Sequence, residues 1–388
     1  MARACIVGIG QSEYTRWGGI KDRSQFQLTV EAILAAVQDA GLAAEDIDGL
    51  ASYSYDANDA PLMQVALGMP ELRWASMVWG GGGGGSIGAL AHACAAVESG
   101  QADTVVVYRG LCQGQSGRFG RAGQSGEYGH ENFILPFGMF SPPQMMALLA
   151  RRFMHLHGIT EAHLAEVALN ARANANRNPK AVMHARPLSE AAYFAGRWIA
   201  EPLRLYDCCL ETDGACAVVV TTRERARDLR GVAVDVLAVG QGSGPGWGSG
   251  PLGSHNMPDA DYGTSNSRAL ARRLFAQAGL QPRDISVAQF YDHFTPLVLM
   301  ALEDFGFCGP GESGDFVAAG SIRPTGTLPI NTAGGLLSEA YVHGLNLLTE
   351  GVRQLRGEST TQVAGASTCL VTGGHGVSPT SAAILGRA

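Results

Sequence analysis

Six consecutive glycines, Gly80–Gly85, separate an apolar segment ending at Val78 from a helix-like segment that runs to about Glu98. A second apolar segment, Ala102–Val107, follows this helix, so the order is strand, helix, strand. A glycine run at the start of a helix permits close backbone approach and leaves amide groups free to bind an anion. Alternation of this kind predicts an α/β fold in which helices cover both faces of largely parallel sheets.

The length of 388 residues and the hydrophobic content of 46% allow two or three domains, or one large two-lobed unit with a sizeable core. A strand–helix–strand order begins again near Gly231, which suggests a pseudo-repeat. We therefore expect an amino-terminal half, residues 1–225, and a carboxy-terminal half, residues 226–388. Within the first half, we expect residues 110–142 to form a long loop with a functional role.

Charge and composition exclude several classes of function. The net charge of −7 and the absence of any Lys/Arg run argue against nucleic-acid binding. No apolar run reaches the roughly 18 residues of a membrane span, and residues 1–10 are expected to form a strand, not a signal peptide. The eight cysteines include no CxxC pair and the histidines show no zinc spacing, so we expect no metal. These features predict a soluble protein of the cytoplasm.

Two segments place polar side chains where a ligand could meet them. Asn331–Asn346 carries a glycine pair before an apolar helical start and offers Asn331, Tyr341 and His343 to a ligand. Tyr291-Asp-His-Phe stands at the end of an expected strand, a position that often serves function in α/β sheets. A purely structural role stays open for each tyrosine as a core aromatic, and for His293.

Six segments together resemble the thiolase superfamily in order as well as in residues. They are Gly-Ser-Ile-Gly-Ala-Leu (85–90), Leu156-His-Gly-Ile-Thr with Asn178-Pro, Leu205-Tyr-Asp-Cys-Cys-Leu-Glu-Thr-Asp-Gly-Ala, Tyr291-Asp-His-Phe, Asn331–Ser338 and Thr372-Gly-Gly-His-Gly. The resemblance covers nearly the whole chain and is closest to the sterol-carrier-type and lipid-transfer-protein-like branch. It implies two βαβαβαββ halves stacked as five αβαβα layers, an active site between the halves, and a homodimer.

The departures from the thiolase pattern indicate a different chemistry. The position of the thiolase nucleophilic cysteine is Gly83, and the positions of two thiolase histidines are Tyr291 and Tyr341. Cys369 stands near the second thiolase cysteine but about one residue out of register. Glycine cannot form an acyl-enzyme. The paired tyrosines resemble those of the steroid side-chain-cleaving aldolases, in which such pairs are associated with retro-aldol cleavage.

The resemblance therefore implies a lyase that cleaves a β-hydroxyacyl-CoA, such as a steroid side-chain thioester with a tertiary hydroxyl, to a ketone and a shorter acyl-CoA such as propionyl-CoA. The reaction needs a base, an acid and enolate stabilisation. We expect Tyr291 and Tyr341 to divide the acid and base roles, in an order left open, with His293 as a third catalytic candidate. The candidate substrate-binding residues are Gly83, Gly84, Asn331, His343, Gly373 and Gly374. No cofactor is expected, because CoA is part of the substrate.

Two other functions stay open. A catalytically inactive thiolase-like subunit, which binds lipid or acts as a scaffold, fits the missing cysteine equally well. A residual acyltransferase would use Cys94 or Cys369. The resemblance also implies a heteromeric complex with a zinc-ribbon/OB-fold partner protein, whose contacts we expect in the loops 110–142 and 241–264.

Overall fold

The computed structural model describes residues 3–54, 56–79, 82–115, 135–139, 141–229, 231–247 and 262–388. Its main sheet has the strand order β10-β11-β12-β9-β1-β8-β5-β3-β4, with β2 paired to β8. The strands are β1 (Ala4–Gln11), β2 (Thr15–Arg16), β3 (Gly49–Tyr53), β4 (Trp74–Val78), β5 (Thr104–Cys112), β8 (Thr212–Thr222), β9 (Val234–Gly242), β10 (Val287–Gln289), β11 (Thr368–Gly373) and β12 (Thr380–Arg387), and a separate pair is formed by β6 (Trp198–Ala200) and β7 (Leu203–Arg204). Strands from the two ends of the chain thus occupy opposite sides of the sheet order, and they join where β1 pairs with β9.

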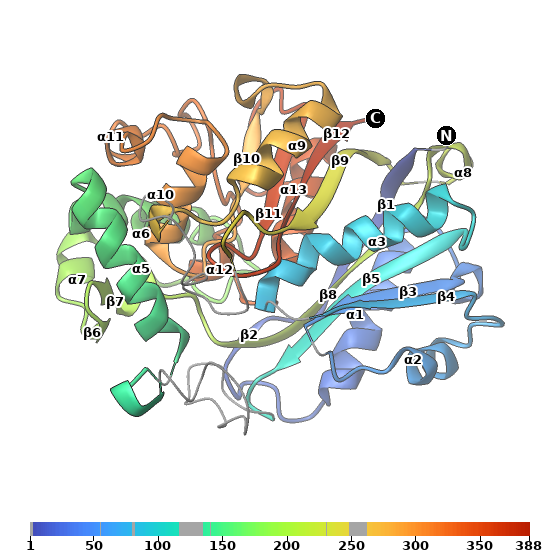
Figure 1. Ribbon diagram of the computed structural model, residues 1–388. Helices are drawn as coiled ribbons and strands as arrows, with labels where there is room; N and C mark the ends of the chain where they lie inside the picture. The colour runs from blue at the N-terminus through green and yellow to red at the C-terminus, as the bar shows by residue number, and fades with distance from the viewer. Residues whose placement is uncertain are drawn as a thin grey trace.

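Helices lie on both faces of these strands (Figure 1). They are α1 (Gln25–Ala40), α2 (Ala60–Leu67), α3 (Ser86–Glu98), α5 (Pro142–His157), α6 (Glu161–Ala175), α7 (Glu190–Phe194), α8 (Arg223–Ala226), α9 (Arg268–Ala278), α10 (Thr295–Asp304), α11 (Ser313–Ala318), α12 (Gly335–Ser338) and α13 (Leu345–Arg356). Helices α3 and α13 each contact strands from both sides of the sheet order, whereas α1 packs on β1, β8 and β5, and α9 packs on β9 and β12. The expected α/β fold with five αβαβα layers is confirmed. The expectation of largely parallel sheets is wrong: in the main sheet β3–β4, β3–β5 and β10–β11 are parallel, whereas the other pairs of described strands, including β1–β8, β1–β9 and β5–β8, are antiparallel. The boundary between residues 225 and 226 stays a prediction.

Local sequence signals explain where the regular elements begin and end. The Oγ atom of Ser24 accepts from the amide of Gln27, the Oε1 atom of Gln27 accepts from the amide of Ser24, and α1 starts there. The same helix ends at Gly41, which has a φ of 72°. Helix α5 begins with Pro142 and ends before Gly158, which has a φ of 66°. Among the described residues, none of the helices combines the length and the apolar character needed to cross a bilayer.

The glycine run leads directly into the helix of the central layer. Gly82–Gly85 form a 3₁₀ turn from which α3 continues. Gly80 and Gly81 lie outside the described residues, as does most of the loops 110–142 and 241–264 for which partner contacts are predicted. The anion-binding role predicted for this run can therefore be placed only for Gly82–Gly85.

Tyr341 lies outside the two helices that flank it. Helix α12 makes a single turn, and Tyr341 belongs to the connection between α12 and α13. His343 and Gly344 have φ values of 47° and 85°, a left-handed conformation that a helix cannot continue through. The chain therefore ends one helix, turns and starts another, and Tyr341, which is partly buried against the core, lies in this turn.

Candidate functional site

The hydroxyl groups of Tyr291 and Tyr341 lie 3.2 Å apart and form a hydrogen bond. Tyr291 follows β10 and is 2% exposed, and its amide donates to Oγ1 of Thr372 on β11 at 2.9 Å. Tyr341 is held by Thr212 on β8, whose Oγ1 accepts from the Tyr341 amide at 2.9 Å and donates to its carbonyl at 3.0 Å. Strands from both sides of the sheet thus fix the backbones of the two tyrosines.

Gly83 borders this pair so closely that no side chain fits there. A Cβ atom at Gly83 would lie 2.0 Å from both Cζ and Oη of Tyr291. The ring is confined from another direction as well, because a Cβ atom at Gly344 would lie 2.8 Å from Cδ2 and Cε2 of Tyr291. A side chain at position 83 and a phenol at position 291 therefore exclude each other in this backbone.

The other predicted glycines lie beside Gly83. A Cβ atom at Gly374 would lie 2.2 Å from Cα of Gly84, and one at Gly373 would lie 2.4 Å from Oγ of Ser86. The turn after β11 and the start of α3 therefore meet backbone to backbone, which only glycine permits at these distances. The structure brings Gly83, Gly84, Gly373 and Gly374 together at the tyrosine pair, and their role in substrate binding stays a prediction.

His293 packs against the first tyrosine. Its ring centroid lies 4.8 Å from that of Tyr291, and its Nδ1 atom lies 3.4 Å from the Tyr291 carbonyl oxygen. The residue is 8% exposed, and its Nε2 atom is buried without a hydrogen-bond partner among the described residues. Burial lowers the pKa of His293 to about 4, so the imidazole is neutral near pH 7.

Asn331 and Asp292 hold the backbone around the pair. The Asn331 side chain accepts from the amide of Phe290 at 2.7 Å and donates to its carbonyl at 3.0 Å. The Asp292 Oδ1 atom accepts from the amide of Leu336 at 2.7 Å, at the start of α12, and burial raises the pKa of Asp292 to about 6. Asn331 was predicted to bind substrate; its amide atoms contact Phe290, and the substrate role stays a prediction.

His343 lies next to the second tyrosine. Its ring centroid is 5.2 Å from that of Tyr341, and the residue is 4% exposed. Its backbone carbonyl accepts a hydrogen bond of 3.0 Å from the hydroxyl of Tyr53, at the end of β3. Burial lowers the pKa of His343 well below its ordinary value, so this ring too is neutral.

A buried ion pair behind the site was missed by the sequence reasoning. Arg109, on β5, is 4% exposed; its Nη1 atom lies 3.1 Å from the Asp56 carboxylate and donates to the Tyr53 carbonyl at 2.6 Å. A single arginine in the otherwise apolar segment 104–112 was the available signal, since a buried cation requires a partner. Tyr53 gave no such signal, because an aromatic residue at a strand end is ordinary.

Burial keeps both phenols protonated at neutral pH. It raises the pKa of Tyr291 well above the ordinary value, and the neighbouring Tyr341 adds to this effect. Burial also raises the pKa of Tyr341, but the hydrogen bond from Tyr291 and the charge of Arg109 partly offset the rise. Each phenol therefore holds its own proton near pH 7.

Known proteins share both this sequence and this fold. A family model for thiolase C-terminal domain-like sequences matches residues 252–387. The 17-hydroxy-3-oxo-4-pregnene-20-carboxyl-CoA lyase of Mycobacterium tuberculosis is 44% identical over 390 residues, covering 99% of each chain. The steroid side-chain-cleaving aldolase of Thermomonospora curvata is 42% identical over 389 residues, covering 99% of this chain and 97% of the other. The chain belongs to the thiolase superfamily, in the branch of the steroid side-chain-cleaving aldolases.

A solved structure of this aldolase branch has the same architecture. The structure described as an Ltp2-ChsH2(DUF35) aldolase superposes with a TM-score of 0.93 at 40% identity, covering 100% of this chain and 98% of that chain. The predicted enzyme class, a lyase of the aldolase type, is confirmed by these relatives.

The two cysteines proposed for a residual acyltransferase lie inside the core of this aldolase. Cys94 on α3 is 3% exposed, and Cys369 on β11 is 0% exposed. Burial raises the pKa of both thiols far above the ordinary value, so neither supplies the thiolate that acyl transfer requires. Among the described residues, no group of three or more His, Cys, Asp or Glu side chains is placed to hold a metal ion.

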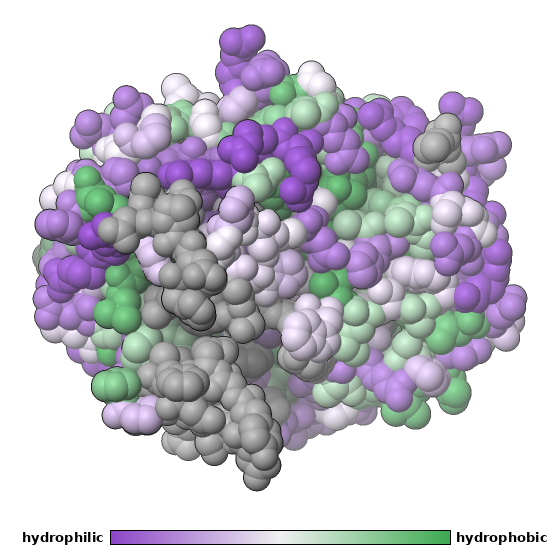
Figure 2. Space-filling model, in the orientation of Figure 1, coloured by the Kyte–Doolittle hydropathy of each residue, from purple (hydrophilic) through white to green (hydrophobic). Residues whose placement is uncertain are grey.

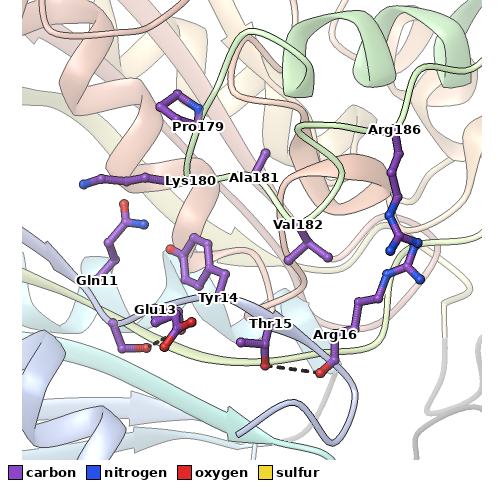
Figure 3. A pocket seen from close by; sticks show the side chains of 11 residues that line it. Gln11, Glu13, Tyr14, Thr15, Arg16, Pro179, Lys180, Ala181, Val182 and Arg186 are labelled. Atoms are coloured by element: carbon purple, nitrogen blue, oxygen red, sulfur yellow. Dashed lines mark hydrogen bonds between the residues drawn. The ribbon is translucent and has the colours of Figure 1, made fainter.

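A separate cleft of about 550 Å³ opens between the segment 11–16 and the loop that follows α6. Figure 3 shows the side chains of Arg16 and Arg186 extending toward each other across it, with Lys180 further along the same wall. Arg16 pairs with Thr212 in the β2–β8 ladder, and the Thr212 hydroxyl in turn donates to the backbone carbonyl of Tyr341. The cleft therefore lies near the backbone of the tyrosine site but is lined by neither phenol.

Proposed function

We propose that this aldolase cleaves a β-hydroxyacyl-CoA by a retro-aldol reaction. The substrate is a steroid side-chain thioester with a tertiary hydroxyl, and the products are a ketone and a shorter acyl-CoA such as propionyl-CoA. The observation that carries the proposal is the contact of two phenols, 3.2 Å apart, with a glycine at the position where a side chain would displace one of them. The lyase from Mycobacterium tuberculosis, whose name specifies a steroid carboxyl-CoA, supports the substrate class.

The chain's own residues support a mechanism without a covalent intermediate. When the bond between the α and β carbons breaks, its electrons form a thioester enolate whose oxygen needs hydrogen-bond donors. Backbone amides at the start of α3 and in the Gly373–Gly374 turn would provide them, in the favourable field of a helix N-terminus. The phenols are protonated, so they serve the enolate as proton donors.

Conservative substitutions test the role of the phenols. Tyr291→Phe and Tyr341→Phe keep the rings and remove the hydroxyls, and each should lower kcat by about 10²–10⁴-fold. Tyr108→Phe is the matched control, because its hydroxyl is also buried and donates to Asn58 O at 2.8 Å, outside the site. The assay measures ketone and shorter acyl-CoA released from a β-hydroxyacyl-CoA with a tertiary alcohol. Cleavage at the wild-type rate by both site variants would remove the proposal.

The other function that the sequence leaves open, an inactive lipid-binding or scaffold subunit, fits the absence of a nucleophile at Gly83 but not the relatives, which are a lyase and an aldolase. The two candidates differ in turnover. An inactive subunit would bind the β-hydroxyacyl-CoA, as measured by calorimetry, and release no ketone. Treatment with iodoacetamide adds a further check, because a reaction that uses no cysteine survives alkylation.

We further propose a heteromeric complex with a zinc-ribbon/OB-fold protein. The solved aldolase relative contains a DUF35 partner, which supports this assembly. Co-expression with such a protein, followed by affinity purification of one component, tests it. Failure of the two to co-purify, together with full activity of the chain alone, would reject the partner.

The free edge of the sheet supports the proposed homodimer. Strand β4 ends the strand order, and its Met77 is 46% exposed. The neighbouring α2 exposes Leu62 and Val65 by 58% and 79%, and apolar surface gathers there at the lower right of Figure 2. Sedimentation velocity of wild type and of Met77→Lys measures the dimer. We also propose that the protein acts in the cytoplasm.

A further inference from the structure

We propose that His293, through its Nε2 atom, accepts the proton of the substrate's β-hydroxyl, while the two phenols act on the enolate. The inference rests on the proposed retro-aldol function and gives this residue a role that differs from theirs. It begins from the hydrogen-bonding state of one buried ring.

The surroundings of the imidazole fix its tautomer. The Nδ1 atom lies 3.4 Å from the carbonyl oxygen of Tyr291, and a carbonyl oxygen can only accept. Nδ1 therefore carries the hydrogen of the neutral ring, and Nε2 presents a lone pair. A lone pair on imidazole nitrogen is the form of histidine that acts as a general base.

The Nε2 lone pair has no donor to satisfy it. His293 is 8% exposed, and Nε2 is buried with no hydrogen-bond partner among the described residues. An unpaired buried acceptor is unfavourable, so a site that contains one is built to receive a donor from elsewhere. A tertiary hydroxyl is such a donor, and the proton that it offers is the one the reaction must remove.

Neighbouring groups are already engaged in other interactions. Tyr291 and Tyr341 share a hydrogen bond and keep their own protons, so neither accepts a proton until it has first lost one. The Asp292 carboxylate caps α12 through the Leu336 amide. The ring nitrogens of His375 lie 2.8 Å from Thr372 Oγ1 and 3.3 Å from Ser267 Oγ.

The proton balance of the step is complete without another reagent. The hydroxyl O–H bond breaks and its proton moves to Nε2, while the oxygen electrons form the ketone C=O bond. The carbon–carbon bond breaks, and its electrons form the enolate. One phenol of the pair then donates its proton to the enolate carbon, and the other, whose hydroxyl lies 3.2 Å away in the resting site, donates a hydrogen bond to the resulting phenolate. Return of the Nε2 proton to that phenolate restores the resting state.

Replacement of the base by an isosteric acceptor tests the proposal. His293→Gln keeps a hydrogen-bonding group near the Nε2 position, but an amide cannot take up the proton. We expect kcat to fall by about 10²–10⁴-fold, with KM and the binding of a β-deoxy acyl-CoA analogue little changed. The matched control is His92→Gln, because His92 on α3 is bonded to Ser76 at 2.7 Å and lies outside the site. A His293→Gln rate within about threefold of wild type would overturn the inference.

The wild-type pH profile provides a second test that does not depend on a variant folding. The titratable groups near His293 and the tyrosine pair are Tyr291, Tyr341, Asp292, His375 and Cys209. Burial raises the pKa values of both tyrosines and of Cys209, raises that of Asp292 to about 6 and lowers that of His375 to about 3, so none of these groups titrates between pH 7 and 9. A neutral imidazole base therefore gives a kcat that is flat across this range, whereas a phenolate base gives one that rises tenfold per pH unit.

The two tests separate this inference from the function on which it rests. If wild type releases no ketone, the proposed function fails. If wild type cleaves its substrate, Tyr341→Phe does not, and His293→Gln remains active, the retro-aldol function stands and only the assignment of the base is rejected.

Discussion

The contact between Gly83 and Tyr291 predicts that a single added methyl group inactivates the enzyme. In Gly83→Ala the new Cβ would lie 2.0 Å from Cζ and Oη of Tyr291, whereas carbon atoms pack at about 3.5–4.0 Å. The ring must therefore move by roughly 1.5 Å, which breaks its hydrogen bond to Tyr341. Overpacking of this kind costs about 1–3 kcal/mol, and displacement of a group that handles protons lowers the rate by about 10²–10⁴-fold. Urea unfolding and the cleavage assay measure the two effects.

A double-mutant cycle with Tyr291→Ala shows whether the phenol is the cause. Once the ring is gone, Gly83→Ala has nothing to displace, so its cost in stability should disappear and leave a coupling of about 1–3 kcal/mol. Gly240→Ala is the control, because its Cβ would meet a single atom, the Cδ1 methyl of Leu270, at 3.2 Å. Additive effects at positions 83 and 291, or a Gly83→Ala enzyme of normal rate, would refute the steric argument.

Other expected outcomes concern the groups that support the site. Arg109→Met leaves the Asp56 carboxylate buried without its cation and should destabilise the fold by about 3–5 kcal/mol in urea unfolding, and an unchanged midpoint would contradict it. Thr212→Val removes both hydrogen bonds to the Tyr341 backbone, at a cost of about 1–3 kcal/mol, and should lower kcat more than it changes KM in steady-state assays. Burial raises the pKa of Glu339 from 4.5 to about 8, so the folded state binds a proton that the unfolded chain has lost between these values. Relative to Glu339→Gln, the free energy of unfolding of wild type should therefore fall as pH rises from about 4.5 to about 8. The same pH dependence of this free energy in both proteins would contradict the prediction.

The fold could be predicted because its signals are local. Periodic apolar residues, the cap at Ser24 and the glycine at position 41 specify α1 without reference to the rest of the chain. The match of Gly83 with Tyr291 was accessible only through the family resemblance, since 208 positions separate the two residues. Their steric exclusion is a property of the folded backbone.

The parts of the site that escaped prediction depend on contacts between distant segments. Thr212 stood in a recognised motif, but nothing in its neighbourhood indicated that it would bind the backbone of Tyr341. Asn331 and His343 look like ligand-binding residues in sequence, yet their folded surroundings include the backbone of Phe290 and the ring of Tyr341. A polar side chain in a turn serves the protein's own backbone as readily as it serves a ligand.

Tyr53 has a consequence for how the enzyme can diversify. Tyr291, Tyr341 and His293 all lie in the last hundred residues. Gly83, which packs against Tyr291, and Tyr53, which donates to the carbonyl of His343, lie in the first hundred. Recombination between these portions would exchange the walls around the substrate and leave the proton-handling groups intact. Such a chimera should stay active only if its new strand end still donates to the carbonyl of residue 343, because this hydrogen bond adds to the β1–β9 pairing in holding one portion against the other.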